Sequence, residues 1–289
     1  MKRTDIVMTE ELKSFLAFDL GHMKEDAFPN KRTDIPYCDD PELLMDIYYP
    51  EEKKDTYPVF LIVFGGGWIS GFRRSRFVEY MLKPLQMGYA CAVAQYTLSL
   101  DDTFPRPVID LKKAVDYLHT HAQELLLDTD NLTLWGESAG GHLALEAALL
   151  PNERLGLTGL NTAVKNLVIF YPITDCDTID RYVKTEKDRH LRPDSVMGIF
   201  LASGLNDPQT LDLASPAHWI HPGMPRLWLQ HGTADRLVTP HQSVELAEKM
   251  RRECPDVPFF FELKEGKEHA DPYFFSMENV KRFIQFIEE

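Results

Sequence analysis

The sequence predicts an α/β fold with a mostly parallel central sheet, helices on both of its faces and a small cap. Short apolar runs alternate with helical stretches through most of the 289 residues, which is typical of a parallel sheet covered by helices. The apolar runs are continuous, and such strands are buried on both faces. A long polar stretch at 175–218 breaks this alternation and indicates the cap.

The expected elements come in a regular order. A helix is expected first, over residues 8–20, with Thr9 as its N-cap. The apolar runs predict strands at 43–49, 59–64, 89–95, 131–135, 167–171, 226–230 and 259–263. Apolar residues at helical spacing predict helices at 107–118, 139–150, 244–250 and 280–287. Within 175–218 only short helical pieces are expected, such as 195–202. We therefore expect one domain over residues 1–289.

Composition excludes several classes of partner. The 45 Asp and Glu residues outnumber the 31 Lys and Arg residues, so the formal net charge is −14. A negative field repels nucleic acid and anionic membrane surfaces. No apolar run has the length of a signal peptide or of a bilayer span, which predicts a cytoplasmic location. The 4 cysteines show no metal-ligand spacing.

The segment 136–140, Gly-Glu-Ser-Ala-Gly, lies between an expected strand and an expected helix. A serine on such a tight turn projects its hydroxyl above the sheet, and the amide of Ala139 points towards the same space. Such pentads also occur by chance, but the strand before and the helix after favour a nucleophile. We therefore expect Ser138 to be catalytic.

A serine nucleophile needs a base and an acid that orients the base. Asp235 follows the strand at 226–230, and His269 follows the strand at 259–263. Both therefore lie at the carboxyl edge of the sheet, where ligands bind in α/β folds. The order Ser138, Asp235, His269 is that of a Ser-Asp-His triad on such a sheet.

Other interpretations of these residues remain open at this point. Asp235 can cap the following helix, and His269 can be a solvated loop residue. His231 is a rival base, and Asp271 and Glu268 are rival acids.

A run of glycines, 65–67, directly follows the strand at 59–64 and precedes Trp68. Backbone amides of glycines can approach an oxyanion without a Cβ in the way. We expect the amides of Gly66, Gly67 and Ala139 to form an oxyanion hole. A phosphate-binding loop is disfavoured because no Gly-Lys-Ser/Thr follows.

Together these segments resemble the hormone-sensitive-lipase-like and acetyl-esterase-like carboxylesterases of the α/β-hydrolase superfamily. The matching positions are 65–68, Tyr96, 104–105, Asp110, 136–142, 215–216, 231–235 and His269. The resemblance implies an α/β-hydrolase fold and hydrolysis of short-chain acyl esters without metal or cofactor. It also implies that residues 1–30 and 175–218 form the cap.

Two departures from the family pattern are visible. Phe64 stands where a histidine usually braces the glycine loop, and residues 97–101 replace the usual Arg-Leu-Ala-Pro-Glu. Both favour the smaller, acetyl-esterase-like members. Trp68 and Glu137 are expected to line the substrate site. His142, one helical turn after the serine, is expected to be structural.

The sequence thus predicts a serine carboxylic-ester hydrolase for short, acetyl-type acyl groups. Its partner is a small-molecule ester, with no cofactor and no metal. The alternatives are a peptidase or amide hydrolase with the same triad, and a ligand-binding protein on a hydrolase frame that has lost catalysis. The oligomeric state stays open, a homo-oligomer included.

Overall fold

The computed structural model describes residues 9–17, 20–182 and 190–289. An eight-stranded sheet runs through the molecule in the order β1-β2-β4-β3-β5-β6-β7-β8. The strands are β1 (Lys31–Pro36), β2 (Leu44–Tyr48), β3 (Tyr57–Val63), β4 (Ala90–Ala94), β5 (Leu127–Glu137), β6 (Asn166–Phe170), β7 (Arg226–Gly232) and β8 (Phe259–Lys264). β2 pairs antiparallel with both of its neighbours, β1 and β4, and the six strands β3 to β8 are parallel to one another. The mostly parallel sheet is therefore confirmed.

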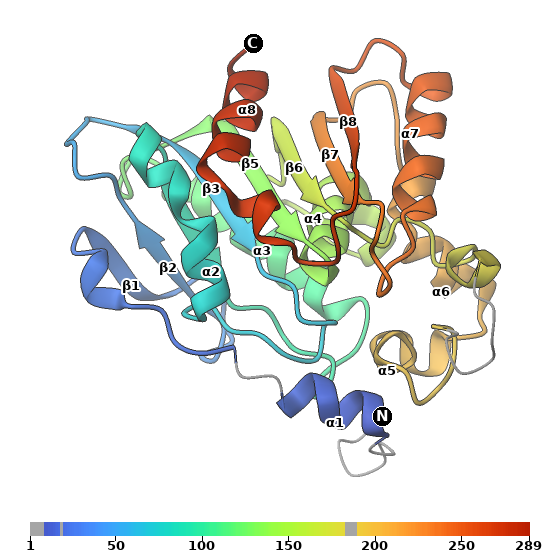
Figure 1. The fold of residues 1–289 in the computed structure, drawn as a ribbon. Helices are drawn as coiled ribbons and strands as arrows, with labels where there is room; N and C mark the ends of the chain where they lie inside the picture. Colours follow the sequence, from blue (N-terminus) through green and yellow to red (C-terminus); the bar gives the residue numbers. More distant parts are fainter. Residues whose placement is uncertain (1–8, 18–19, 183–189) are drawn as a thin grey trace.

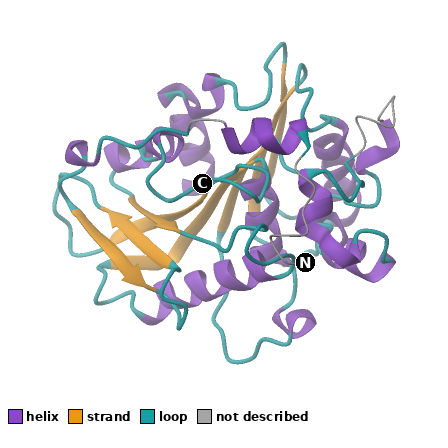
Figure 2. Ribbon diagram, turned by 90° about the horizontal axis from the view of Figure 1, so that it is seen from below, coloured by secondary structure: helices purple, strands orange, loops and turns teal. Residues whose placement is uncertain are grey.

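Helices cover both faces of this sheet (Figures 1 and 2). They are α1 (Glu10–Ala17), α2 (Arg76–Met81), α3 (Arg106–Thr120), α4 (Ala139–Leu149), α5 (Val196–Leu201), α6 (Pro208–Leu213), α7 (His241–Glu253) and α8 (Met277–Glu288). α3 and α4 pack together on one face, while α2 and α8 lie on the other (Figure 1). The expected helix at 8–20 is shorter within the described residues, and Thr9 accepts the amide hydrogen of Leu12, as an N-cap does.

Aromatic side chains fill the core between the sheet and α8. The fully buried Trp135 lies at the centre, with the rings of Phe60, Phe170 and Phe283 at 6.0, 5.9 and 5.0 Å. Phe283 belongs to the apolar face of α8, so this helix is held by the burial of one side. The sheet is thereby a rigid base for the loops that leave its strands.

The carboxyl ends of the parallel strands open towards α1 and α5, which lie beside each other below the sheet in Figure 1. Leu12 of α1 packs with Ile69, Val196 and Ile199 in a small apolar cluster. The helix α1 and the insertion after β6 therefore meet beside this edge of the sheet. In the part of the chain that is described, no helix is long and apolar enough to cross a bilayer.

At Gly140 the backbone of α4 packs directly against the backbone at the end of β3. A Cβ on Gly140 would lie 2.1 Å from the carbonyl oxygen of Val63 and 2.5 Å from that of Phe64. Because these neighbours are backbone atoms, they cannot rotate away. The first turn of α4 and the end of β3 thus depend on a residue without a side chain.

We expect Gly140→Ala to lower the free energy of unfolding by about 1–3 kcal/mol, the usual cost of overpacking, although alanine is the better helix former. Urea denaturation measures this change. Gly223→Ala is the matched control, because Gly223 is exposed and its Cβ would meet only the His221 side chain at 3.5 Å. Equal stability of the two variants would contradict the close packing of α4.

Candidate active site

Ser138 occupies a strained position between β5 and α4. Its φ is 52°, in the left-handed region that non-glycine residues rarely adopt. The glycines on either side permit this turn, since a Cβ on Gly136 would lie 2.4 Å from the carbonyl oxygen of Gly140. The amide of Ser138 donates to the carbonyl of Phe170 on β6. Backbone contacts alone thus fix the serine at the edge of the sheet.

A chain of hydrogen bonds links Ser138 to the loops after β7 and β8. His269 Nε2 lies 2.9 Å from Ser138 Oγ, and His269 Nδ1 lies 2.7 Å from Asp235 Oδ2. A carboxylate only accepts hydrogen bonds, so Nδ1 carries the proton and Nε2 accepts the serine hydroxyl. The structure therefore brings together the three residues that the sequence singled out, in the geometry that activates a serine.

Asp235 is held as an anion. Its Oδ1 accepts the amides of Leu237 and Val238, each at 2.9 Å. Burial alone would raise the pKa of Asp235, but hydrogen bonds from His231 and His269 hold this pKa well below its usual range. A lasting negative charge thus faces the proton on His269.

The loops that carry Asp235 and His269 are tied to each other. The amide of Ala234 donates to the carbonyl of Lys267 at 2.9 Å, and that of Thr233 to the carbonyl of Lys264 at 3.0 Å. The ring of Tyr171, at the end of β6, lies 4.6 Å from the His269 ring. The imidazole of His269 is thus held by the carboxylate of Asp235 at Nδ1 and by the ring of Tyr171.

The rival residues occupy other places. His231 is fully buried and its ring nitrogens contact Asp235, Val238 and Ser243, whereas the imidazole on Ser138 is that of His269. Asp271 accepts the amide of Tyr273 and forms an ion pair with Lys267 at 3.3 Å. The carboxylate that hydrogen-bonds His269 is that of Asp235.

The glycine loop after β3 has free donors beside Ser138. Gly66 and Gly67 have positive φ values of 113° and 59°. Within the described residues, the amides of Gly66, Gly67 and Ala139 have no hydrogen-bond acceptor. Gly66 and Gly67 line the same cavity as Ser138, and Ala139 directly follows Ser138 in the chain.

Other residues do the work of the histidine that Phe64 replaces. The Phe64 ring stacks on Tyr96 at 4.5 Å, and the Tyr96 hydroxyl donates to the Phe64 carbonyl at 2.9 Å. Ser70 Oγ donates to the carbonyl of Gly66 at 2.9 Å. The amide of Gly65 donates to a carboxylate oxygen of Glu137. The loop is therefore braced by a tyrosine, a serine and a buried glutamate.

Glu137 lines the cavity, as expected, and it also holds the glycine loop after β3 through the amide of Gly65. Burial raises the pKa of Glu137 to about 7, although His269 and the amide of Gly65 act to lower it. Its side chain thus changes charge near neutral pH, directly beside the serine.

Trp68 does not line the cavity, contrary to the expectation from the sequence. Its ring is 2% exposed, stacks on Phe200 at 4.5 Å and donates from Nε1 to His142 Nδ1 at 3.3 Å. His142 in turn bonds the carbonyl of Ala214 through Nε2 at 3.0 Å. His142 is thus structural, as expected. The sequence placed Trp68 beside the glycines, but its positive φ of 60° turns the indole into the core.

A cavity of about 440 Å³ lies in front of Ser138 and His269. Apolar side chains dominate its walls, namely Phe15, Leu20, Phe64, Phe77, Leu237 and Ala270. Of the described residues that line it, Glu137 and His269 are the titratable ones. The sequence did not point to Phe15 or Leu20 as wall residues; the apolar face of the first helix was the available signal.

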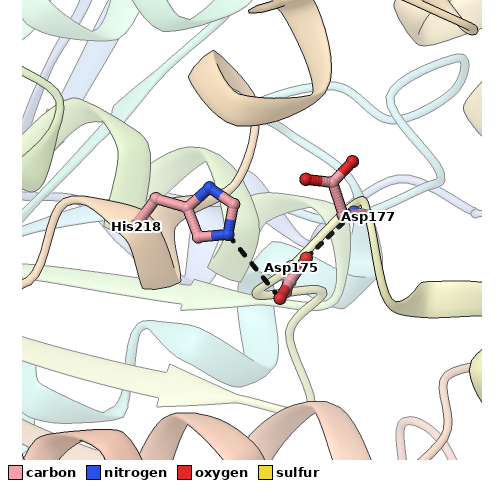
Figure 3. A group of neighbouring side chains, drawn as sticks. All are labelled: Asp175, Asp177 and His218. Atoms are coloured by element: carbon pink, nitrogen blue, oxygen red, sulfur yellow. Dashed lines mark hydrogen bonds and ion pairs between the residues drawn. The ribbon is translucent and has the colours of Figure 1, made fainter. Parts of the chain in front are cut away.

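Asp175, Asp177 and His218 lie close together beyond β6 and form a cluster of metal-ligand type (Figure 3). His218 is paired with Asp212 at 2.9 Å and with Asp175 at 3.7 Å. Asp175 also accepts the amides of Asp177 and Thr178. These pairings account for the cluster as an ion pair that joins two loops, and we assign no metal to it.

The sheet order, together with a serine after β5, an acid after β7 and a histidine after β8, defines the α/β-hydrolase class. The BD-FAE family profile matches residues 45–250, and the chain belongs to this family.

Curated relatives carry esterase names. "Probable carboxylic ester hydrolase LipM" of Mycobacterium tuberculosis is 27% identical over 72% of this chain and 48% of its own length. "Esterase LipQ" of the same organism is 26% identical over 76% of this chain and 52% of its own length. The chain thus spans about half the length of these curated relatives.

Solved structures share the fold. A truncated carbohydrate esterase from gut microbiota has a TM-score of 0.78 at 22% identity, covering 92% of this chain and 98% of that one. Thermogutta terrifontis esterase 2 with bound propionate has a TM-score of 0.67 at 23% identity, covering 90% and 92% of the two chains. At these identities the likeness shows the fold alone.

We expect the Glu137→Gln variant to become more stable relative to wild type as the pH rises. Folding raises the pKa of Glu137 from 4.5 to about 7, so the folded wild type binds a proton more tightly than the unfolded chain does. The wild type therefore loses stability as the pH rises from 4.5 to about 7, whereas the neutral glutamine does not titrate. The difference in the free energy of unfolding should grow by about 3 kcal/mol between about pH 4 and pH 8.

Urea denaturation of both proteins across this pH range measures the difference. Glutamine keeps an oxygen that accepts the amide of Gly65, so the loop brace is preserved. Glu153→Gln, at an exposed position, is the control and should show a difference that does not change with pH. A pH-independent difference for Glu137→Gln would refute the titration of Glu137 near neutrality.

Proposed function

We propose that this chain is a serine hydrolase of carboxylic esters, with Ser138 as nucleophile, His269 as base and Asp235 as the orienting acid. The observation that carries this proposal is the hydrogen-bonded chain from Ser138 through His269 to Asp235, at 2.9 and 2.7 Å, at the floor of a cavity. The esterase names of the curated relatives support it.

The mechanism follows from the geometry. His269 takes the proton of Ser138 as the serine oxygen attacks the ester carbonyl, and Asp235 stabilises the resulting imidazolium. The amides of Gly66, Gly67 and Ala139 hold the oxyanion. His269 then protonates the departing alcohol. A water that loses a proton to His269 attacks the acyl-enzyme, and the proton returns to Ser138 as the acid leaves.

The cavity favours uncharged acyl groups. No lysine or arginine is among the described residues that line it, and Glu137 repels carboxylates when ionised. We propose a small-molecule ester with a short acyl group, acetyl in the first place, as the substrate. The mechanism uses the side chains of the chain itself and needs no cofactor.

We further propose that residues 1–30 and 175–218 form a cap on a single domain; residues 1–8, 18–19 and 183–189 of these segments lie outside the described residues. Phe15 and Leu20 in the cavity wall support this proposal for the first segment. Val196 and Ile199 of α5, packed on Leu12, support it for the second.

Two alternatives use the same frame. An amide hydrolase would need the same serine and histidine, because the triad does not choose the acyl donor. A ligand-binding protein would be expected to lack one of the three residues, whereas here all three are hydrogen-bonded. The rates on matched ester and amide substrates distinguish an esterase from an amide hydrolase. Stoichiometric ligand binding without turnover would identify a ligand-binding protein.

We expect the wild type to cleave p-nitrophenyl acetate faster than the butyrate and the octanoate. Ser138→Ala should lower kcat/KM by at least about 10⁴-fold, because the acyl-enzyme cannot form. Release of p-nitrophenol measures both. Equal activity of wild type and variant would refute Ser138 as nucleophile, and a preference for octanoate would refute the short acyl group.

We expect kcat/KM to fall as the pH is lowered, because protonated His269 cannot accept the serine proton. A pH–rate profile on p-nitrophenyl acetate, at pH values where the fold is intact by circular dichroism, measures this. A rate that stays flat down to about pH 4, well below the range in which imidazoles usually titrate, would contradict a histidine base.

A further inference from the structure

A second histidine lies against the carboxylate of Asp235, opposite His269. His231 Nε2 is 3.2 Å from Asp235 Oδ2, the oxygen that also binds His269 Nδ1 at 2.7 Å. The same Nε2 lies 3.0 Å from the carbonyl oxygen of Val238. The side chain of His231 is fully buried at the end of β7. One carboxylate oxygen is thus shared by two imidazoles.

The partners of His231 define where its proton lies. Asp235 Oδ2 and the Val238 carbonyl can only accept, so Nε2 carries the hydrogen. It donates this hydrogen to the Val238 carbonyl and at the same time lies 3.2 Å from Asp235 Oδ2. On the other side of the ring, Nδ1 is 2.7 Å from the hydroxyl of Ser243 on α7. In the neutral ring this nitrogen accepts, so the Ser243 hydroxyl donates to it. The imidazole is fixed by a contact at each nitrogen.

His231 also determines the shape of the loop that comes after it. Asp235 Oδ1 accepts the amides of Leu237 and Val238, and the carbonyl of Val238 faces back to His231. The loop therefore closes around the imidazole and places Asp235 Oδ2 between the two histidines. A change at His231 acts on the hydrogen-bond partner of His269 directly, although His231 lies outside the cavity.

We propose that His231 is a positioning residue for the reaction: its Nε2–H fixes Asp235 Oδ2 and takes part of the negative charge that this oxygen offers to His269. The proposal rests on the proposed function. It assigns no proton transfer to His231, because the ring is separated from Ser138 by Asp235 and His269.

The contact of His231 with Asp235 Oδ2 predicts the direction in which the acid limb of the kcat/KM profile moves when this contact is lost. With the His231 donor removed, the carboxylate offers its charge to His269 alone and stabilises the imidazolium more strongly. Protonated His269 then persists to higher pH, and the acid limb of the kcat/KM profile moves up. A less firmly held Asp235 also orients His269 less well, which lowers kcat. KM does not change, because His231 does not line the cavity.

The titratable groups that face His231 are Asp235, His269 beyond it, and Tyr171 at the end of β6, whose ring is 6.4 Å away. Glu137 interacts with His269 and Tyr171 and changes charge near neutral pH, and it is the same in every variant compared. Burial raises the pKa of Tyr171 far above its usual range, so this residue stays neutral. Substitutions at His231 and Ser243 leave all three in place. A shift of the acid limb therefore reports on the contact between His231 and Asp235.

Two substitutions separate this contact from the rest of the imidazole. His231→Asn keeps a polar group near the position of Nδ1, within reach of Ser243, and removes the donor at Nε2. His231→Gln places an amide N–H near the position of Nε2. Ser243→Ala is the control, because it removes a buried hydrogen bond to His231 and leaves Nε2–H on Asp235. Each is assayed with p-nitrophenyl acetate from about pH 4 to pH 9, together with thermal unfolding.

We expect His231→Asn to lower kcat about 10- to 100-fold, to leave KM within about twofold, and to move the acid limb up by roughly half to one pH unit. His231→Gln should recover most of kcat and the wild-type acid limb. Ser243→Ala should lower the melting temperature and keep the wild-type profile.

Wild-type kcat and acid limb in His231→Asn would overturn the proposal, as would a Ser243→Ala profile that matches His231→Asn. If His231→Asn does not unfold cooperatively, His231→Leu, which also removes the Nε2 donor, is compared with His231→Gln. A raised acid limb in His231→Leu alone supports the proposal, and the wild-type limb in both variants overturns it. An inactive wild type, or an active Ser138→Ala, would refute the proposed function instead.

Discussion

The close approach of α4 to β3 and β5 is the constraint on which the rest of the site depends. Ser138 keeps its unfavourable backbone only because Gly136 and Gly140 let strand, turn and helix pack without side chains between them. The same approach sets the amide of Ala139 beside the glycine loop after β3. The loops after β7 and β8 approach this fixed serine. Hydrogen bonds between the two loops hold Asp235 and His269 together as one unit.

Two buried carboxylates lie at this site, Asp235 within the unit and Glu137 beside Ser138, and their surroundings shift their pKa values in opposite directions. Asp235 accepts two amides and faces two imidazoles, which keeps its pKa low in spite of burial. Burial raises the pKa of Glu137 to about 7 and outweighs the opposite effects of His269, the amide of Gly65 and Tyr171. The balance between burial and the donors around each carboxylate separates a permanent anion from a group that changes charge near neutrality.

The features that could be predicted from the sequence are those that depend on continuous apolar runs and on the ends of strands. These patterns located the six parallel strands and β2, and they placed Ser138, Asp235 and His269 at one edge. They did not predict β1, whose residues 31–36 are polar and end in a proline, or the six-residue helices α2 and α6, which are too short for a periodic pattern. Trp68 was misplaced because a position beside the glycines does not reveal which way a side chain turns. The pairing of Phe64 with Tyr96 depends on two separate strands and has no local signal.

The contact of Phe15 with the glycine loop separates two tasks within the molecule. A Cβ on Gly67 would lie 2.9 Å from the ring of Phe15, so the first helix rests directly on the loop that would hold the oxyanion. Ser138 and His269 are held by the ends of strands, whereas Phe15 reaches the same cavity from a helix that is not part of the sheet. A substitution at Phe15 can therefore reshape the cavity while the sheet and its turns keep their packing. The size of the cavity is thus open to change at a position that the stability of the sheet does not constrain.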